Sequence, residues 1–444
     1  MNKEILRITL PSIVTNITVP LLGIVDLAIV GHISEESAAA IIGAVSVGTL
    51  IFNMVYWLFN FLRMGSSGLT AQAYGRGDTA SQRRILRMAL TVALGCGSAL
   101  VALQRPIEWT AQWIIAPSEE VWTLAIAYFR IRIWAAPAVL ALFAMNGWLV
   151  GMQNSRYPMY IAIGQNLINI TVSYLLVTHF HLGIEGVAMG TVLSQYIGLA
   201  AACLFCIHLQ RQSGHLSTKL STPLSTNQQE TVQIEWKTFF VVNRDIFFRM
   251  ICLIAVTTAF TSYGARMGDT MLAVNTLLMQ LFTLFSYFSD SFALAGEALV
   301  GKHIGGKQSP APLIHRLFLW GWGVALLFTF TYGTGGMNLL KIFTQDQELL
   351  QATSPYLTWV TGIPLCGIAA FMWDGIYIGA TRTRQMFISL LIGALLFFGI
   401  YEAGSRLIDP KLLNHLLWGA FLTYLLARGG VLWWYWEMDG RRKM

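Results

Sequence analysis

Twelve long apolar runs divide this chain, and each is long enough to cross a lipid bilayer. They lie at about 8–31, 40–62, 86–104, 121–145, 158–178, 184–209, 246–265, 271–296, 317–336, 354–378, 385–404 and 413–436. A spanning helix needs about 20 mostly apolar residues, and an open sheet cannot satisfy its backbone hydrogen bonds in lipid. Charged residues make up 11% of the chain, against roughly 25% in an average soluble domain. The sequence therefore predicts an all-α integral membrane protein with twelve transmembrane helices, which excludes soluble enzymes and nucleic-acid-binding proteins.

Basic residues are concentrated in alternate connections between these runs. The richer connections and the two ends of the chain carry Lys3, Arg7, Arg76, Arg83, Arg84, Arg156, Arg211, Lys219, Lys237, Arg244, Lys302, Lys307, Arg316, Arg382, Arg384, Arg441, Arg442 and Lys443. The other connections hold only Arg105, Arg266, Lys341, Arg406 and Lys411. Because basic loops stay on the cytoplasmic side, this alternation predicts a multi-pass protein with both termini in the cytoplasm. The net charge of +7 is attributed to orientation in the membrane rather than to a nucleic-acid partner.

A polar segment rich in Ser, Thr, Gln and Asn interrupts the apolar runs near the middle of the chain. It divides the sequence into an N-terminal lobe (1–210), a flexible cytoplasmic linker (211–236) and a C-terminal lobe (237–444). Both halves contain the pattern Asn/Asp-Gly-x-x-x-Gly-x-x-x-x-Arg, which begins at Asn146 and again 228 residues later at Asp374. We therefore predict an internal duplication, with two six-helix lobes related by a pseudo-two-fold axis along the membrane normal. Transporters often hold their substrate between such repeats.

Asp26 is a charged residue inside the first apolar run, where a charge is costly and a functional role would explain it. No other charged residue lies between Arg7 and Glu35, and a charge at the bilayer centre costs at least about 2.5 kcal/mol. Pro11 and Pro20 precede Asp26 in the same run, and an internal proline removes a backbone hydrogen bond and bends a helix. Because burial disfavours the charged form of a carboxylate, we expect Asp26 to take up and release a proton as the helix bends. The alternative is a carboxylate held statically by hydrogen bonds.

Polar side chains also gather in the fifth run, at Gln165, Asn166, Asn169 and Ser173, and Thr191 lies in the sixth. Spacings of three and four residues place positions 166, 169 and 173 on one helical face. Their oxygens are suited to hydrogen-bond a carboxylate or a drug-like ligand, or to ligate a hard cation. Gln165 and Asn166 are candidate substrate contacts. Ordinary hydrogen bonding between helices is the alternative.

The second half contributes three carboxylates, Asp290, Glu297 and Asp374. Asp290 and Glu297 are seven residues apart, roughly on one helical face, and are further candidates for substrate binding. All three carboxylates are expected towards the cytoplasmic side. One interpretation is that they pair with the nearby arginines Arg249, Arg382 and Arg384, and the other is that they form a second cation site.

Two arginines, Arg130 and Arg132, lie within the fourth run. They are expected either to extend towards the membrane surface or to pair with Asp26. The five cysteines, Cys96, Cys203, Cys206, Cys252 and Cys366, all fall in apolar runs and are interpreted as inert packing residues.

Sequence patterns of nucleotide binding and of hydrolysis are missing from the chain. It contains no Gly-x-x-x-x-Gly-Lys-Ser/Thr, no His-Glu-x-x-His and no Gly-x-Ser-x-Gly. We therefore predict a protein that is not an enzyme, with no cofactor and no firm metal site.

Several segments together resemble the multidrug and toxic compound extrusion (MATE) family. The segment from Leu10-Pro11 to Asp26-Leu-Ala-Ile-Val-Gly31-His32 is similar to the opening of the family, as is Gly68-Leu-Thr-Ala-Gln72 with Gly75. Two segments of the second half, Asp290-Ser-Phe-Ala-Leu-Ala-Gly-Glu297-Ala-Leu-Val-Gly301 and Asp374-Gly-Ile-Tyr-Ile-Gly379-Ala-Thr-Arg382, resemble the DNA-damage-inducible F (DinF) branch. The resemblance covers nearly the whole chain.

This resemblance implies a secondary active antiporter of the bacterial inner membrane that exports cationic, amphipathic drugs in exchange for H+ or Na+. It implies that Asp26 is the protonation or cation site, with Asn169 and Thr191 as its partners. Many members of the family carry a second carboxylate four residues after that asparagine, where this chain has Ser173. A single titrating carboxylate favours H+ as the coupling ion, and Na+ stays possible because a serine can still ligate it. We expect a monomer.

Two other functions are also compatible with the sequence. A flippase for a lipid-linked precursor, built on a related fold, needs a basic cavity for a phosphate, and Arg130 and Arg132 keep this alternative open. An intramembrane transferase needs acid–base or nucleophilic residues that converge at one membrane face. Asp290, Glu297 and Asp374 are its only candidates, and a two-lobe repeat gives no reason for them to surround one bond.

Overall fold

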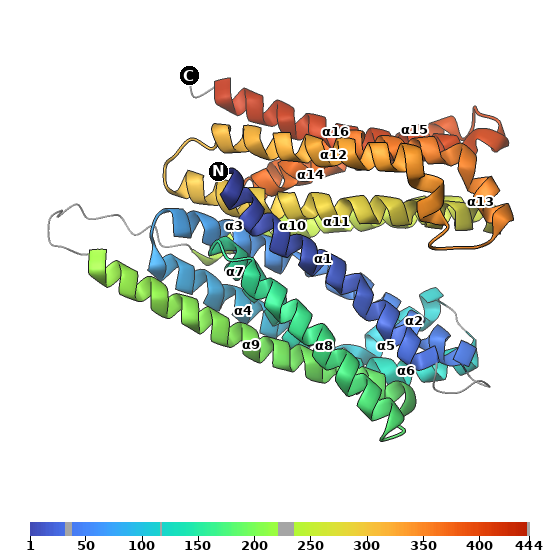
Figure 1. Ribbon diagram of the computed structural model, residues 1–444, viewed down its shortest axis with the longest axis horizontal. Coiled ribbons are helices and arrows are strands. Elements are labelled where there is room, and N and C mark those ends of the chain that lie inside the picture. Colours follow the sequence, from blue (N-terminus) through green and yellow to red (C-terminus); the bar gives the residue numbers. More distant parts are fainter. Residues whose placement is uncertain (32–37, 116–117, 221–234, 442–444) are drawn as a thin grey trace. The chain divides into compact units, whose positions relative to one another are not determined.

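The computed structural model describes the backbone of residues 1–31, 38–115, 118–220 and 235–441, and the side chains of residues 1–18, 41–113, 118–119, 121–212 and 235–439. Within these ranges every regular element is a helix, as the ribbon in Figure 1 shows. The α-helices are α1 (Asn2–Gly31), α2 (Ala38–Leu58), α3 (Phe61–Gly75), α4 (Thr79–Ala102), α5 (Gln104–Ile115), α6 (Glu119–Arg132), α7 (Ala136–Gly151), α8 (Arg156–Thr178), α9 (Gly183–Leu220), α10 (Trp236–Arg266), α11 (Asp269–Gly305), α12 (Ala311–Leu340), α13 (Gln347–Thr353), α14 (Leu357–Gly379), α15 (Thr383–Gly404) and α16 (Leu413–Arg441). Short 3-10 turns join α6 to α7, α13 to α14 and α15 to α16.

Ten stretches of the described residues are long and apolar enough to cross a membrane. They are Ile41–Gly75, Thr79–Ala102, Val121–Gly151, Arg156–Thr178, Gly183–Gln212, Asp269–Gly305, Ala311–Leu340, Gln347–Gly379, Thr383–Gly404 and Pro410–Asp439. Each of them overlaps one predicted run. The two other predicted runs, 8–31 and 246–265, lie in the helices α1 and α10. The chain is therefore an all-helical, multi-span membrane protein, and the number of twelve spans stays a prediction.

Several predicted boundaries differ from the structure, and two of them differ most. The second run was expected to end at residue 62, but its stretch continues through α3 to Gly75. Hydropathy misses this extension because Ser66, Ser67 and Thr70 are polar, yet all three are fully buried. The predicted linker starts at residue 211, whereas α9 continues to Leu220, so its first residues are helical. Residues 221–234 lie outside the described chain.

The chain divides into two compact units, Leu10–Phe240 and Val241–Met444, and residues Met1–Thr9 belong to the second of them. In the unit of Leu10–Phe240, α7 packs against α3 through two glycines. A β-carbon built at Gly147 would lie 2.1 Å from the carbonyl oxygen of Arg63, and one at Gly151 would lie 2.7 Å from that of Ser67. Only glycine permits so close an approach of two helix backbones.

The unit that contains Val241–Met444 repeats this arrangement between α14 and α11. A β-carbon at Gly375 would lie 2.1 Å from the carbonyl oxygen of Ala293, and one at Gly379 would lie 2.5 Å from that of Glu297. These two glycines belong to the second copy of the repeated sequence pattern. The shared pattern therefore has the same physical role in each unit, which is close packing of two helices.

The turns at the ends of these helices match as well. Gln153 after α7 and Thr381 after α14 both have a left-handed backbone, with φ of 64° and 54°. Gly77 after α3 and Lys307 after α11 form a second such pair, with φ of 72° and 55°. In each turn the backbone N–H of the residue after the left-handed position donates to a carbonyl oxygen of the helix. The donors and acceptors are Asn154 to Leu149 (3.0 Å), Arg382 to Tyr377 (3.0 Å), Asp78 to Ala73 (3.0 Å) and Gln308 to His303 (2.8 Å). This is the helix-ending geometry that satisfies carbonyls left free at a C-terminus.

Candidate functional site

A buried polar strip lies between α8 and α9 in the unit of Leu10–Phe240. Small residues on α9 make room for the polar side chains of α8. A β-carbon at Gly190 would lie 2.2 Å from Oγ of Ser173, and one at Gly198 would lie 2.4 Å from the side chain of Gln165. The two helices therefore approach closely along the face that carries the predicted site residues.

Asn169 and Thr191, which the family resemblance implies as partners of Asp26, are in contact with each other in this strip. Asn169 donates from Nδ2 to Oγ1 of Thr191 at 3.0 Å, and Thr191 donates in turn to the carbonyl oxygen of Val187 at 3.1 Å. Asn169 and Ser173 are both fully buried. Oδ1 of Asn169 and Oγ of Ser173 have no hydrogen-bond partner among the residues that the structure describes. Because an unsatisfied buried polar atom is costly, these two oxygens mark a place suited to a further polar group or an ion.

The same face of α8 reaches α1 and continues along α9. Asn166 donates from Nδ2 to the carbonyl oxygen of Thr18 at 2.7 Å, and Gln165 donates to Oε1 of Gln195 at 2.9 Å. Both amides, expected as substrate contacts, hold helices together in this conformation. Asp26, the predicted centre of the site, lies in α1, but its side chain is outside the described set, as is that of Pro20. Pro11 is described, and it lies in α1 as a buried residue.

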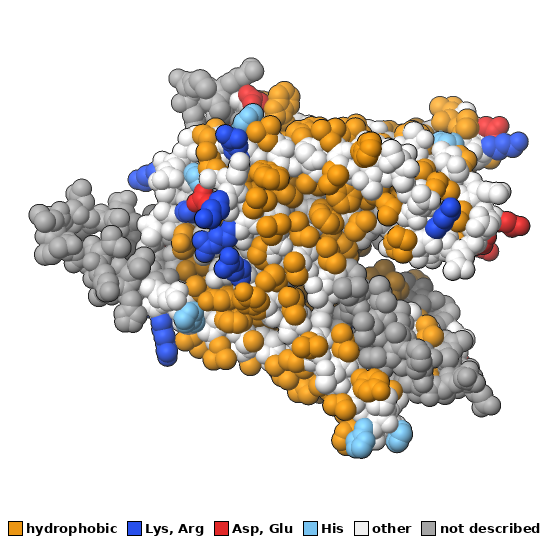
Figure 2. Space-filling model, in the orientation of Figure 1, with side chains coloured by type: hydrophobic (Ala, Val, Ile, Leu, Met, Phe, Trp, Pro, Cys, Tyr) orange, Lys and Arg blue, Asp and Glu red, His pale blue; other side chains and the backbone are white. Residues whose placement is uncertain are grey.

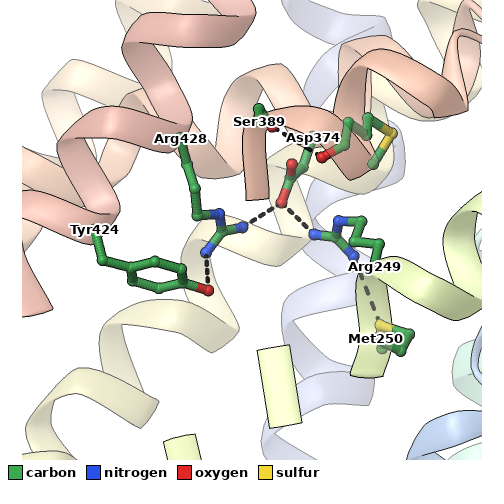
Figure 3. Close-up of polar contacts among 7 residues, drawn as sticks. Arg249, Met250, Asp374, Ser389, Tyr424 and Arg428 are labelled. Atoms are coloured by element: carbon green, nitrogen blue, oxygen red, sulfur yellow. Dashed lines mark hydrogen bonds and ion pairs between the residues drawn. The ribbon is translucent and has the colours of Figure 1, made fainter. Parts of the chain in front are cut away.

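The second unit contains a buried charge cluster around Asp374 on α14, drawn in Figure 3. Arg249 on α10 and Arg428 on α16 both donate to its Oδ2, and the Arg428 contact measures 2.6 Å. Arg428 also donates to the hydroxyl oxygen of Tyr424 at 3.3 Å. Asp374 is 7% exposed, and each arginine is 4% exposed. Arg249 was one of the partners expected from the sequence, whereas Arg428 was not singled out.

This cluster carries two guanidinium charges against one carboxylate, so its net charge is positive. A hard cation needs several anionic or neutral oxygens facing it, and here two buried cations already occupy the carboxylate. The second cation site considered for Asp374 is therefore disfavoured by this geometry. The signal that would have identified Arg428 was present, since it is a lone arginine inside the apolar run 413–436 and such residues need a buried partner.

The other two carboxylates of this unit differ from each other. Asp290 is exposed on α11, whereas Glu297, seven residues later, is 2% exposed and packs where α11 meets Gly379 of α14. The two carboxylates therefore differ in exposure, although their spacing of seven residues places them roughly on one face of α11. Arg382, expected as a partner of these carboxylates, donates to Asp439 at 2.6 Å instead.

The arginines of the fourth run have partners that the sequence did not suggest. Arg130 on α6 forms an ion pair with Glu108 of α5, with Nε 2.8 Å from Oε1. Arg132 donates to the hydroxyl of Tyr128 at 2.6 Å and to Oγ1 of Thr49 at 3.1 Å. Glu108 was missed because it lies in a short amphipathic helix between two apolar runs.

Comparisons with known proteins agree with this architecture. The profile of the MatE family matches residues 11–175 and 246–400. The DNA damage-inducible protein F of Escherichia coli (strain K12) is 35% identical over 430 residues, which cover 96% of this chain and 90% of that protein. The probable multidrug resistance protein NorM of Thermotoga maritima is 24% identical over 370 residues, or 79% of this chain and 74% of the relative. A crystal structure of MATE in the bent conformation superposes with a TM-score of 0.83 at 15% identity, over 100% of this chain and 96% of the other.

Proposed function

Because the chain belongs to the MatE family of membrane transporters, we propose that it is a secondary active antiporter that exports cationic, amphipathic compounds in exchange for H+. We place it in a bacterial inner membrane with both termini in the cytoplasm, since basic residues gather in the alternate connections. The names of its relatives, among them a probable multidrug resistance protein, support drug-like substrates. The single observation that carries the mechanism is the pair of unpartnered buried oxygens on Asn169 and Ser173.

Two six-helix lobes related by a pseudo-two-fold axis form the proposed framework. The repeated glycine contacts and the two pairs of left-handed turns support a duplication, because independent evolution would have no reason to repeat both at nearly equal spacing. A duplicated pair of lobes is a common basis of alternating access in transporters, with the substrate held between the repeats.

Helix register supports Asp26 as the coupling residue. In the ribbon, α1 and α8 run in the same direction, and the bond from Asn166 to the carbonyl of Thr18 fixes their relative level. From that level Ser173 lies seven residues further along α8 and Asp26 eight residues further along α1. With a rise of about 1.5 Å per residue, both stand roughly 10–12 Å beyond the bond. This register places Asp26 of α1 and Ser173 of α8 at about the same level, and we propose that Asp26 forms one coupling site with Asn169 and Ser173.

The proposed cycle follows from the cost of a buried charge. A proton from the outside neutralises Asp26, and the neutral carboxyl then hydrogen-bonds Asn169 and Ser173. α1 bends at Pro11 and Pro20, the space beside it contracts, and the drug leaves outwards. The return to the inward state releases the proton to the cytoplasm. Ser173 in place of a second carboxylate favours H+ over Na+, because a site with one carboxylate offers a cation little charge.

The substrate is proposed to contact Gln165 and Asn166 once the bonds that these amides make to α9 and α1 are released. The exposed carboxylate of Asp290 supplies negative charge for a cationic drug. Glu297 is assigned a packing role instead, because it is buried where α11 meets α14.

The test is ethidium efflux from proteoliposomes, with a pH gradient and a Na+ gradient imposed separately. The proposal expects efflux driven by the pH gradient in the wild type and in Asp269→Asn, a control that makes the same change at an exposed carboxylate, and no such efflux in Asp26→Asn. Full proton-driven efflux in Asp26→Asn would overturn the coupling role of Asp26. Efflux driven by Na+ alone would support the transport function, but it would identify Na+ in place of H+ as the coupling ion.

A flippase for a lipid-linked precursor is the second candidate, and one observation favours it. The cluster of Arg249, Arg428 and Asp374 leaves a net positive charge inside the unit, as a phosphate-bearing substrate would require. Both arginines are held by Asp374, however, which leaves little charge for a substrate. A headgroup-accessibility assay in vesicles distinguishes the two functions, since only a flippase moves the labelled lipid when no cationic drug is present.

A further inference from the structure

A cavity of about 210 Å³ lies within the unit of Met1–Thr9 and Val241–Met444, away from the sites described above. It is lined by Asn2 of α1 and by Arg316, Leu319 and Trp320 of α12. Asn2, in the first turn of α1, thus lines one side of the cavity, and residues 316–320 of α12 line the other.

Arg316 lines this cavity, and further basic residues lie on the helices near it. Lys3 and Arg7 are exposed on the first turns of α1, and Arg316 is exposed on α12. Lys302 near the end of α11 lies 3.7 Å from Glu4, the one acidic residue in these turns of α1. Figure 2 shows Lys and Arg side chains gathered around the N-terminal end of α1. The orientation rule explains basic residues at a membrane surface, but it does not explain a cavity that Arg316 lines.

The cavity changes from charged to apolar along α12. Arg316 lies in the second turn of this helix, and Leu319 and Trp320 follow one turn later, inside the stretch able to cross the membrane. Leu319 is half exposed, and the ring of Trp320 stacks on Phe292 of α11 with centroids 6.2 Å apart. A free anion needs only the charged end. A molecule with an anionic head and an apolar tail matches both ends in this order.

We propose that the cavity binds one anionic phospholipid. Arg316 contacts the headgroup phosphate, Lys302 and Lys3 add long-range attraction, and Leu319 and Trp320 contact the upper part of an acyl chain. Basic pockets between helices at the cytoplasmic surface are a recurring form of lipid recognition. The bound lipid links the start of α1 to α12. This contact precedes Pro11 along α1, whereas Asp26 follows Pro11.

The experiment measures lipid binding to the full-length protein in neutral detergent by native mass spectrometry. The probes are short-chain phosphatidylglycerol, phosphatidylcholine and inorganic phosphate, added separately. We expect one phosphatidylglycerol to bind in preference to phosphatidylcholine, and excess inorganic phosphate not to displace it. Arg316→Gln should weaken this binding about fivefold, as expected for the loss of one basic contact with an anionic lipid. Arg83→Gln, an exposed arginine in the second turn of α4, should leave binding unchanged.

Three outcomes would overturn the proposal: equal binding of the two lipids, displacement by inorganic phosphate, and equal losses in Arg316→Gln and Arg83→Gln. Arg316→Lys, which keeps the charge, covers the case in which Arg316→Gln fails to fold, and it should retain the preference for the anionic lipid. Efflux is not the readout, so the result is independent of the proposed transport function.

Discussion

Arg428 donates from Nη2 to Oδ2 of Asp374 at 2.6 Å, and both side chains are almost completely buried. The same carboxylate oxygen also accepts from Arg249. Three helices that are far apart in the sequence, α10, α14 and α16, therefore meet at one charged atom. The energetic consequence depends on which partner is removed.

Asp374→Asn should destabilise the protein strongly, because it removes the buried carboxylate that accepts hydrogen bonds from two buried guanidinium groups. Removal of one partner from a buried ion pair costs about 3–5 kcal/mol. Arg428→Met should cost less, since the Arg249–Asp374 pair that remains is neutral. Thermal unfolding in detergent checks the order, with Tm falling further in Asp374→Asn than in Arg428→Met. The reverse order, or a wild-type Tm for Asp374→Asn, would show that the cluster is not the net positive centre described above.

Gly375→Ala should disrupt the packing of α14 on α11, because the new methyl group would overlap the carbonyl oxygen of Ala293. Overpacking in a rigid interior costs about 1–3 kcal/mol. Gly399→Ala on α15 is the matched control, since nothing lies within 4 Å of a β-carbon built there. In the control, alanine should be neutral or stabilise the helix by up to about 1 kcal/mol. Equal Tm values for the two variants would refute the close contact.

Lys307→Gly should raise the stability of the turn between α11 and α12. Lys307 has φ of 55°, a conformation that costs a residue with a side chain about 1–2 kcal/mol. Part of this gain is offset by the greater freedom of glycine in the unfolded chain. The corresponding turn of the other unit already has Gly77 at this place. The measurement is Tm, with Gln308→Gly as the control, which should lower it; a fall in both variants would contradict the prediction.

Ser173→Ala should separate coupling from stability. The hydroxyl of Ser173 is buried and unpartnered among the described residues, so its loss should leave Tm unchanged or slightly higher. If Ser173 assists Asp26, efflux driven by a pH gradient should fall. Ser289→Ala is the control, because Ser289 is also a fully buried serine with an unpartnered hydroxyl, on α11 of the other unit. Equal efflux in the two variants would remove Ser173 from the coupling site.

Hydropathy and loop charge predicted the helical class and most spans, because the cost of polar groups in lipid leaves few alternatives. Hydropathy failed at α3, where Ser66, Ser67 and Thr70 are polar yet fully buried against another helix. Hydropathy records transfer to lipid, and it does not record packing against protein. The left-handed turns could not be predicted from the sequence either, since Gln and Thr, found at positions 153 and 381, are not residue types that favour a positive φ.

The candidate site was predictable only in part. Helical spacing brought Asn169 and Ser173 to one face, and family resemblance supplied Thr191, which the structure places 3.0 Å from Asn169. The pairing of Arg428 with Asp374 was not found, because the two residues lie 54 positions apart and no spacing rule links two helices that pack side by side. Such pairs depend on which helices are neighbours, and the sequence pattern of a single helix does not contain that information.

One helix belongs to both units, and this has a consequence for how the chain could be divided. The first turns of α1 pack with Val241–Met444, and their Ile5 and Ile8 are buried, while the rest of α1 belongs to the other unit. A gene split between the two halves would encode a second fragment that lacks part of its own core. It would also encode a first fragment that begins with an apolar segment, around Ile5 and Ile8, without its packing surface. Because α1 contributes residues to both units, each half expressed alone is expected to have an incomplete core.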